Sequence, residues 1–169
     1  MKIFTKPYKA RVVLMSVQKK INIQNKKARF EFEILDKYVA GIQLTGTEIK
    51  SIRQSKARIT ESFCEFNDRG ELFIVNMYIE EYAFGHHYNH KPTSERRLLL
   101  NKRELRSLKK DVEAKGNTIV PLRLFLNENG WAKLEIALAK GKKVHDKRET
   151  MKDRDNKRDL ARIKKNFNS

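Results

Sequence analysis

The sequence predicts a mainly β fold, a small antiparallel barrel of about six strands with flanking helices. Three observations support this prediction. Apolar and polar residues alternate over many short segments, turn signals separate these segments, and the apolar spacing changes to that of a helix in only two places. A chain of 169 residues fits one such domain with appendages.

The first half of the chain is predicted to contain four strands and one short helix. A strand starts at Phe30, and a second, at 40–44, follows a turn near Asp36–Lys37. The helix comes next: Ile49 and Ile52 lie three residues apart, and Thr47 can cap it. Strands at 62–66 and 71–82 follow, joined by a hairpin turn at 68–70, and a polar loop covers 85–95.

The second half is predicted to be a helix followed by a β-hairpin. Residues 96–100 lead into the helix, for which Asn101 is the expected N-cap, Glu104 occupies the third helical position, and Gly116 marks the end. Its expected buried stripe is Leu105, Leu108 and Val112. Clean alternation at 118–126 and 131–139 predicts the hairpin. Strands this short and numerous close most economically into a barrel such as the oligonucleotide-binding (OB) type.

Positive charge is concentrated at the two ends of the chain. The chain has 38 Lys/Arg and 21 Asp/Glu residues, a formal net charge of +17. Residues 1–29 contain nine basic residues and no acid, and residues 140–169 contain twelve basic and five acidic residues, so the centre is almost neutral. We therefore divide the chain into a basic extension (1–25), an OB-type barrel domain (26–139) and a basic tail (140–169). Cationic arms on a neutral core favour a nucleic-acid partner over arms that only confer solubility.

The tail is predicted to be disordered or loosely helical until a partner binds. Residues 140–148 have no apolar period. After them, Arg154, Arg158 and Arg162 recur every four residues, but the accompanying apolar stripe is too short to hold a helix on the barrel.

Bulk features restrict the class of protein. No apolar run reaches the length of a membrane span, and the first residues lack the apolar region of a secretory signal. Cys64 is the only cysteine, so the chain cannot form an internal disulfide, and this fits a reducing cytoplasm. We expect the Cys64 side chain to lie in the core. We expect a cytoplasmic monomer that does not bind membranes, with Met15 as a candidate start.

No catalytic motif is present in the sequence. His86, His87 and His90 are the best candidates for a metal site, but a zinc site needs a fourth ligand and fixed geometry, so a polar loop is the favoured interpretation. There is no phosphate-binding P-loop and no nucleophile elbow. We therefore expect neither catalysis, nor a cofactor, nor a metal.

Basic and aromatic residues support RNA binding. Lys50, Arg53 and Lys56 lie along or just after the first predicted helix, and Arg96 and Arg97 begin a later apolar run. The nearby side chains that can stack on or bond to unpaired bases are Gln43, Tyr82, Tyr88, Asn89 and His90.

Several segments resemble one known family. These are GIQLTGTEIKSIRQSKARI (41–59), GHHYNHKP (85–92), RRLLLNKREL (96–105) and, most specifically, AKGKKVHDKRETMKDRD (139–155). Together they closely resemble the small protein B family, SmpB, the SsrA-binding protein, over residues 26–167. The first fourteen residues have no recognised counterpart.

The resemblance implies a non-enzymatic RNA-binding protein of bacterial trans-translation. Members of this family carry an OB-type barrel, bind the tRNA-like domain of transfer-messenger RNA (tmRNA), and enter stalled ribosomes with it. The barrel replaces the missing anticodon arm, and the basic tail folds into a helix in the empty mRNA channel of the small subunit.

The resemblance also suggests which residues contact RNA. Gly46, Glu48, Lys50, Ser51 and Arg53 match the first-helix motif, while Asn89, His90, Arg96 and Leu99 match the loop and strand that face the tmRNA elbow, and Lys133 matches a barrel lysine. The expected ribosome-binding tail residues are Lys140, Lys142, Lys143, His145, Asp146, Lys147, Arg148, Arg154, Arg158 and Arg162. The chain departs from the family at Val39, where relatives often carry Glu, at Lys91, which replaces Asp, and at Ser94, which replaces Arg.

Two other functions stay open at the level of sequence. A ribosomal or ribosome-assembly protein would bind rRNA permanently through its arms and would copurify with all ribosomes. A metal-dependent hydrolase would use His86, His87 and His90 and would bind one equivalent of zinc.

Overall fold

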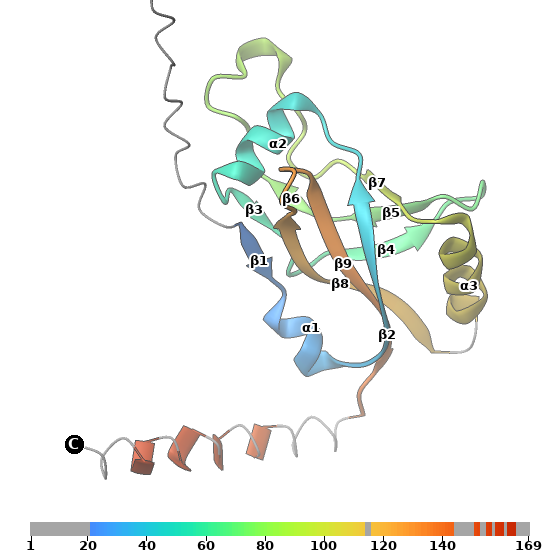
Figure 1. The fold of residues 1–169 in the computed structure, drawn as a ribbon, viewed down its shortest axis with the longest axis vertical. Coiled ribbons are helices and arrows are strands. Elements are labelled where there is room, and N and C mark those ends of the chain that lie inside the picture. Colours follow the sequence, from blue (N-terminus) through green and yellow to red (C-terminus); the bar gives the residue numbers. More distant parts are fainter. Residues whose placement is uncertain are drawn as a thin grey trace, which may run out of the picture.

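The computed structural model describes residues 21–113 and 116–143, and residues 151–152, 155–156, 158–160 and 162–164 of the tail. Figure 1 shows a curved β-sheet with helices at its periphery. No helix among these residues has the length and apolar character needed to cross a membrane.

Six antiparallel strands form a closed ring, as the sequence predicted. They are β2 (Phe32–Ile42), β4 (Phe63–Phe66), β5 (Leu72–Val75), β7 (Arg96–Leu99), β8 (Asn117–Leu126) and β9 (Ala132–Gly141). Their order is β8-β4-β5-β7-β2-β9, and β9 pairs with β8 to close the barrel. The short strand β1 (Asn22–Gln24) adds to β8, and β3 (Ala57–Arg58) pairs with β6 (Tyr78–Ile79) in a separate two-stranded sheet.

The barrel interior is a single apolar core. Its fully buried side chains include Ile74, Leu124, Leu134 and Ile136, which alternate with outward-facing residues along their strands. Helix α2 (Gly46–Arg53) contributes Ile52 to this core. Burial of such aliphatic side chains is the main stabilising term for a domain of this size.

Helix α3 (Lys102–Glu113) packs on the same core through the predicted stripe. Leu108 is fully buried, and Leu105 and Val112 pack beside it. Figure 1 shows α3 at the opposite side of the barrel from α2. The two helices therefore present separate surfaces.

The start of the folded region differs from the prediction. Residues Lys26–Glu31 form helix α1, not a strand from Phe30. The Asn25 side chain accepts a hydrogen bond from the Ala28 N–H, which caps the helix, and Ala28 packs on Val120 and other residues of β8 and β9. The tertiary contact of Ala28 therefore favours a helix in a segment whose alternating sequence predicts a strand.

The predicted turn at Asp36–Lys37 is wrong. Strand β2 runs through these residues and pairs with β9 along most of its length. A β-bulge between Ile34 and Asp36 absorbs one extra residue and shifts the alternation. Both residues of the polar pair that resembled a turn are exposed on this long strand.

The predicted strand 71–82 is two strands. Asn76 has a φ of 58°, a left-handed conformation that Asn tolerates, and it separates β5 from β6. The cap of α2 is Thr45 rather than Thr47. The predicted hairpin at 118–126 and 131–139 is confirmed by the antiparallel pairing of β8 with β9.

The described residues of the tail beyond Lys143 are helical and exposed. Arg158 and Arg162 form ion pairs with Asp155 at 3.6 Å and Asp159 at 3.5 Å, each within the tail. Such exposed pairs contribute little to stability. Of the predicted tail contacts, residues 145–148 and Arg154 lie outside the described residues.

Candidate nucleic-acid interface

Helix α2 begins at a capping box that also holds a buried charge. The Thr45 hydroxyl accepts a hydrogen bond from the Glu48 N–H, and Glu48 Oε2 accepts one from the Thr45 N–H at 2.7 Å. The other carboxylate oxygen, Oε1, accepts a hydrogen bond from Arg96 Nε, also at 2.7 Å. Glu48 and Arg96 are each 3% exposed, so this ion pair lies inside the protein.

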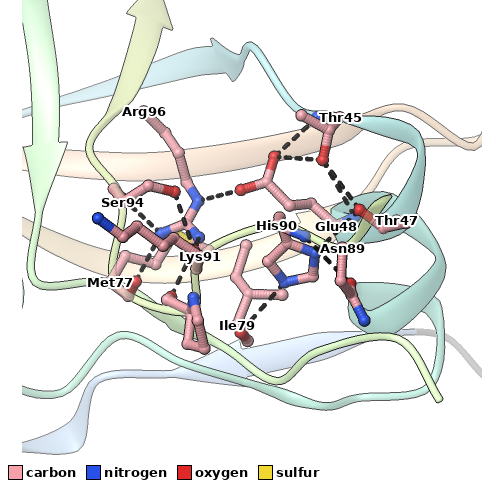
Figure 2. Close-up of polar contacts among 11 residues, drawn as sticks. Thr45, Thr47, Glu48, Met77, Ile79, Asn89, His90, Lys91, Ser94 and Arg96 are labelled. Carbon is pink, nitrogen blue, oxygen red and sulfur yellow. Dashed lines mark hydrogen bonds and ion pairs between the residues drawn. The ribbon is translucent and has the colours of Figure 1, made fainter. Parts of the chain in front are cut away.

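Arg96 uses all of its donors within the protein. Its Nη1 donates to the carbonyl oxygens of Met77 and Ser94, and its Nη2 donates to those of Pro92 and Lys91. With the bond from Nε to Glu48, every guanidinium N–H has a partner, as Figure 2 shows. One side chain therefore joins α2, strand β7 and the loop before it.

Two neighbouring side chains fix the other half of this loop. Asn89 Oδ1 accepts hydrogen bonds from the Tyr82 and His90 N–H groups, and Asn89 Nδ2 donates to the Tyr82 carbonyl. His90 Nε2 lies 3.2 Å from the Ile79 carbonyl oxygen, which can only accept, so Nε2 carries the proton. His90 Nδ1 then accepts from the Thr47 hydroxyl at 2.9 Å (Figure 2).

Close packing against Asn89 also explains one glycine. A Cβ at Gly85 would lie 2.7 Å from Asn89 Cγ, closer than real contacts allow. Any side chain at Gly85 would therefore push the Asn89 amide away from the hydrogen bonds that hold the loop. Glu48, Asn89, His90 and Arg96, which the sequence singled out, thus lie in one connected network, which we call the loop clamp.

Cations and aromatic rings cover the surface above the loop clamp. Lys50 Nζ lies 5.0 Å from the centroid of the Tyr82 ring, and Tyr82 packs edge-to-face with Phe84. Phe84 and Tyr88 are 73% and 93% exposed. Exposed rings of this kind offer flat faces on which unpaired bases can stack.

Arg53 extends this surface toward the tip of the β8–β9 hairpin. Its Nη2 would lie 3.7 Å from a Cβ at Gly130, and the neighbouring Trp131 is 70% exposed. In the part of the chain that the structure describes, neither Lys50 nor Arg53 forms an ion pair. Both positive charges are available to a polyanion.

A second group of predicted residues lies on the outer barrel wall. Gly41 is the register partner of Leu99 on one side and Lys133 on the other. Because Gly41 has no side chain, the barrel surface is recessed between Leu99 and Lys133. Leu99 is 50% exposed. Val39, on the same face of β2, is 54% exposed. We call this row the barrel-wall row.

The start of the tail is attached to helix α1. The Lys142 N–H donates to the Glu31 carbonyl at 3.0 Å, and Lys142 Nζ donates to the Arg29 carbonyl at 3.4 Å. Lys140 and Lys143 are exposed.

Gly46 is the first residue of α2, and Ser51 is buried within this helix.

The structure does not assemble the histidines into a metal site. His86 and His87 are exposed, while His90 points into the loop clamp. Within residues 21–113, 116–143 and the described tail positions, no three His, Cys, Asp or Glu residues are placed to hold a metal. Cys64 lies in the core, and burial raises the pKa of its thiol far above the ordinary value, which suppresses the nucleophilic thiolate.

Sequence reasoning missed Phe84, Gly85 and Trp131. The phase of the alternation in β9 could have identified Trp131, because the buried positions begin at Ala132. No comparable pattern exists for the irregular loop that carries Phe84 and Gly85.

Comparison with known proteins agrees with this geometry. The sequence pattern described as SmpB protein matches residues 22–166. The chain belongs to the SmpB family. A protein named SsrA-binding protein from Flavobacterium psychrophilum is 70% identical over 149 residues, which cover 88% of this chain and 99% of that protein.

More distant relatives and a solved structure extend the comparison. The SsrA-binding protein of Cytophaga hutchinsonii is 57% identical over 88% of this chain and 96% of its own length. A solved structure described as "tmRNA-SmpB: a journey to the center of the bacterial ribosome" is 48% identical, with a TM-score of 0.62. The match covers 73% of this chain and 86% of that chain.

Proposed function

We propose that this protein binds the tRNA-like domain of transfer-messenger RNA and delivers it to stalled ribosomes in trans-translation. The observation that carries the proposal is membership of the SmpB family, with relatives named SsrA-binding proteins and a similar chain in a tmRNA–SmpB ribosome structure. A ribosomal or assembly protein is not favoured by these relatives. We place the protein in the cytoplasm and assign it no catalytic activity.

Two surfaces are assigned to the RNA in this proposal. Lys50 and Arg53 neutralise phosphates, while the rings beside them stack on unpaired bases. The barrel-wall row, with Leu99 and Lys133, provides a second contact. Support comes from the exposure of Lys50, Arg53 and Leu99 and from the absence of ion pairs at Lys50 and Arg53 within the described residues.

The loop clamp acts by positioning in this proposal. Arg96 has no donor left for RNA, because all five of its N–H groups bond within the protein. Glu48 and His90 are also buried. The residues of the loop clamp hold the loop that carries Phe84 and Tyr88 against α2, so that these exposed rings keep a fixed position.

The tail is assigned to the empty mRNA channel. Its basic residues would contact rRNA phosphates there, and a channel that contains mRNA would exclude it. The hydrogen bonds of Lys142 to α1 support separate roles for the barrel and the tail, because they fix the point where the tail leaves the barrel.

A competition gel shift tests the proposal. Full-length protein is bound to labelled tmRNA, and unlabelled tmRNA or bulk tRNA is titrated as competitor. We expect tmRNA to compete at a concentration at least tenfold lower than that of bulk tRNA. Equal competition by both RNAs would show general polyanion binding and overturn the assignment.

A further inference from the structure

The outer face of helix α3 carries unpaired positive charge. Its exposed cations are Lys102, Arg103, Arg106, Lys109 and Lys110. None of them forms an ion pair with a described residue, whereas Lys27, Lys56, Arg97 and Arg123 on other elements each have a carboxylate partner. The α3 cations share this lack of a described partner with Lys50 and Arg53 of α2, and they form a second group of unpaired positive charge on the barrel.

The acids of α3 are engaged elsewhere. Glu104 Oε2 accepts a hydrogen bond from the Asn101 N–H at 3.1 Å, and Asp111 Oδ2 accepts one from the Ser107 hydroxyl at 3.3 Å. Both acids are half-buried, which leaves Glu113 as the exposed carboxylate of the helix. A solvated surface helix usually mixes the two signs on its outer face, and this helix separates them.

Packing holds this cationic face in a fixed direction. Leu108 is fully buried against the barrel, so the helix cannot rotate without exposing its apolar stripe. Arg103, Arg106 and Lys110 follow one another along the exposed side over about 10 Å of helix, at 1.5 Å per residue. The face carries no aromatic side chain, so it suits phosphates and not bases.

We propose that the outer face of α3 binds backbone phosphates of ribosomal RNA, as a contact separate from the tmRNA surface on α2 and its loop. The inference rests on the proposed function, because the choice of ribosomal RNA follows from position. Figure 1 shows α3 on the far side of the barrel from α2 and from the loop that packs on it. An RNA seated on α2 and on that loop leaves the outer face of α3 uncovered, and therefore open to a second RNA.

The test compares two triple variants of the full chain. The first is Arg103→Gln, Arg106→Gln and Lys110→Gln, and the matched control is Lys26→Gln, Lys37→Gln and Arg58→Gln, which removes three exposed charges from other elements. Glutamine is a good helix former, and unchanged urea midpoints verify that both variants fold. Each variant is measured for binding to tmRNA alone and, as the tmRNA complex, for binding to ribosomes over a range of salt.

We expect the α3 variant to bind tmRNA normally and to reduce the salt slope of ribosome binding by about two, since each phosphate contact contributes roughly 0.7–0.9. The control variant should change that slope by less than half a unit. Equal slopes for the two variants, or an equal loss in the tmRNA arm, would overturn the inference. If the wild-type protein failed to select tmRNA, the proposed function would be overturned instead. That failure would be seen in the measurement of binding to tmRNA alone.

Discussion

Arg96 and Arg97 are adjacent arginines with opposite environments. Strand alternation places Arg96 in the loop clamp beside Glu48, while Arg97 is exposed and pairs with Glu71 at 2.8 Å. A buried charge that loses its partner is costly, whereas an exposed pair contributes little. The two residues therefore form an internal comparison.

Arg96→Met should lower the free energy of unfolding by about 3–5 kcal/mol, because Glu48 would remain buried without its partner. Arg97→Met should lower it by no more than about 1 kcal/mol. Urea unfolding of both variants measures the difference. Similar losses for the two variants would mean that the loop clamp does not stabilise the fold.

The same pair shows how far sequence reasoning reaches at this scale. The apolar run after Arg97 is visible in the sequence, but which arginine faces inward depends on the register of β7 with β2 and β5. The family resemblance named Glu48 in one set of expected RNA contacts and Asn89, His90 and Arg96 in another, and the structure brings the four together. The sequence had no means of separating the side chains that bind within the protein from those that remain exposed.

Helix α2 has the residues assigned to RNA on one side and its packing residues on the other. Ile52 is fully buried, while Lys50 and Arg53 are exposed, so their charge can change without disturbing the core. Lys56 and Arg97 are exposed cations already paired with Glu80 and Glu71. These paired residues provide a matched control.

The double variant Lys50→Gln and Arg53→Gln should reduce the salt slope of tmRNA binding by about 1.5, since two phosphate contacts are lost. The control, Lys56→Gln with Arg97→Gln, should change the slope by less than half as much, because these cations already have partners. Filter binding at several salt concentrations gives both slopes. If the paired cations matter as much as the free ones, the phosphate contacts do not centre on α2.

Elements with strong local signals were predictable, and those decided by tertiary contacts were not. The β8–β9 hairpin and the buried stripe of α3 follow directly from periodicity. Helix α1 exists because Ala28 packs on the outer barrel wall, and β2 continues through Asp36 because β9 pairs with it. Neither contact can be seen from neighbouring residues in the sequence.

At the scale of the whole molecule, the body and the tail are assigned separate tasks. The barrel is complete by Gly141, and Lys142 joins it to α1. A truncation after Lys143 therefore keeps every strand and both bonds of Lys142. It removes the basic residues beyond Lys143 that are assigned to the mRNA channel, keeps Lys140, Lys142 and Lys143, and leaves the surface assigned to tmRNA intact.

The most direct test of this account is tagging of stalled peptides by the protein truncated after Lys143. The account predicts tmRNA affinity within about twofold of wild type, with tagging reduced to background. A second truncation that removes only Asn168 and Ser169 controls for shortening and should tag normally. Tagging by the Lys143 truncation at the wild-type level would contradict the account.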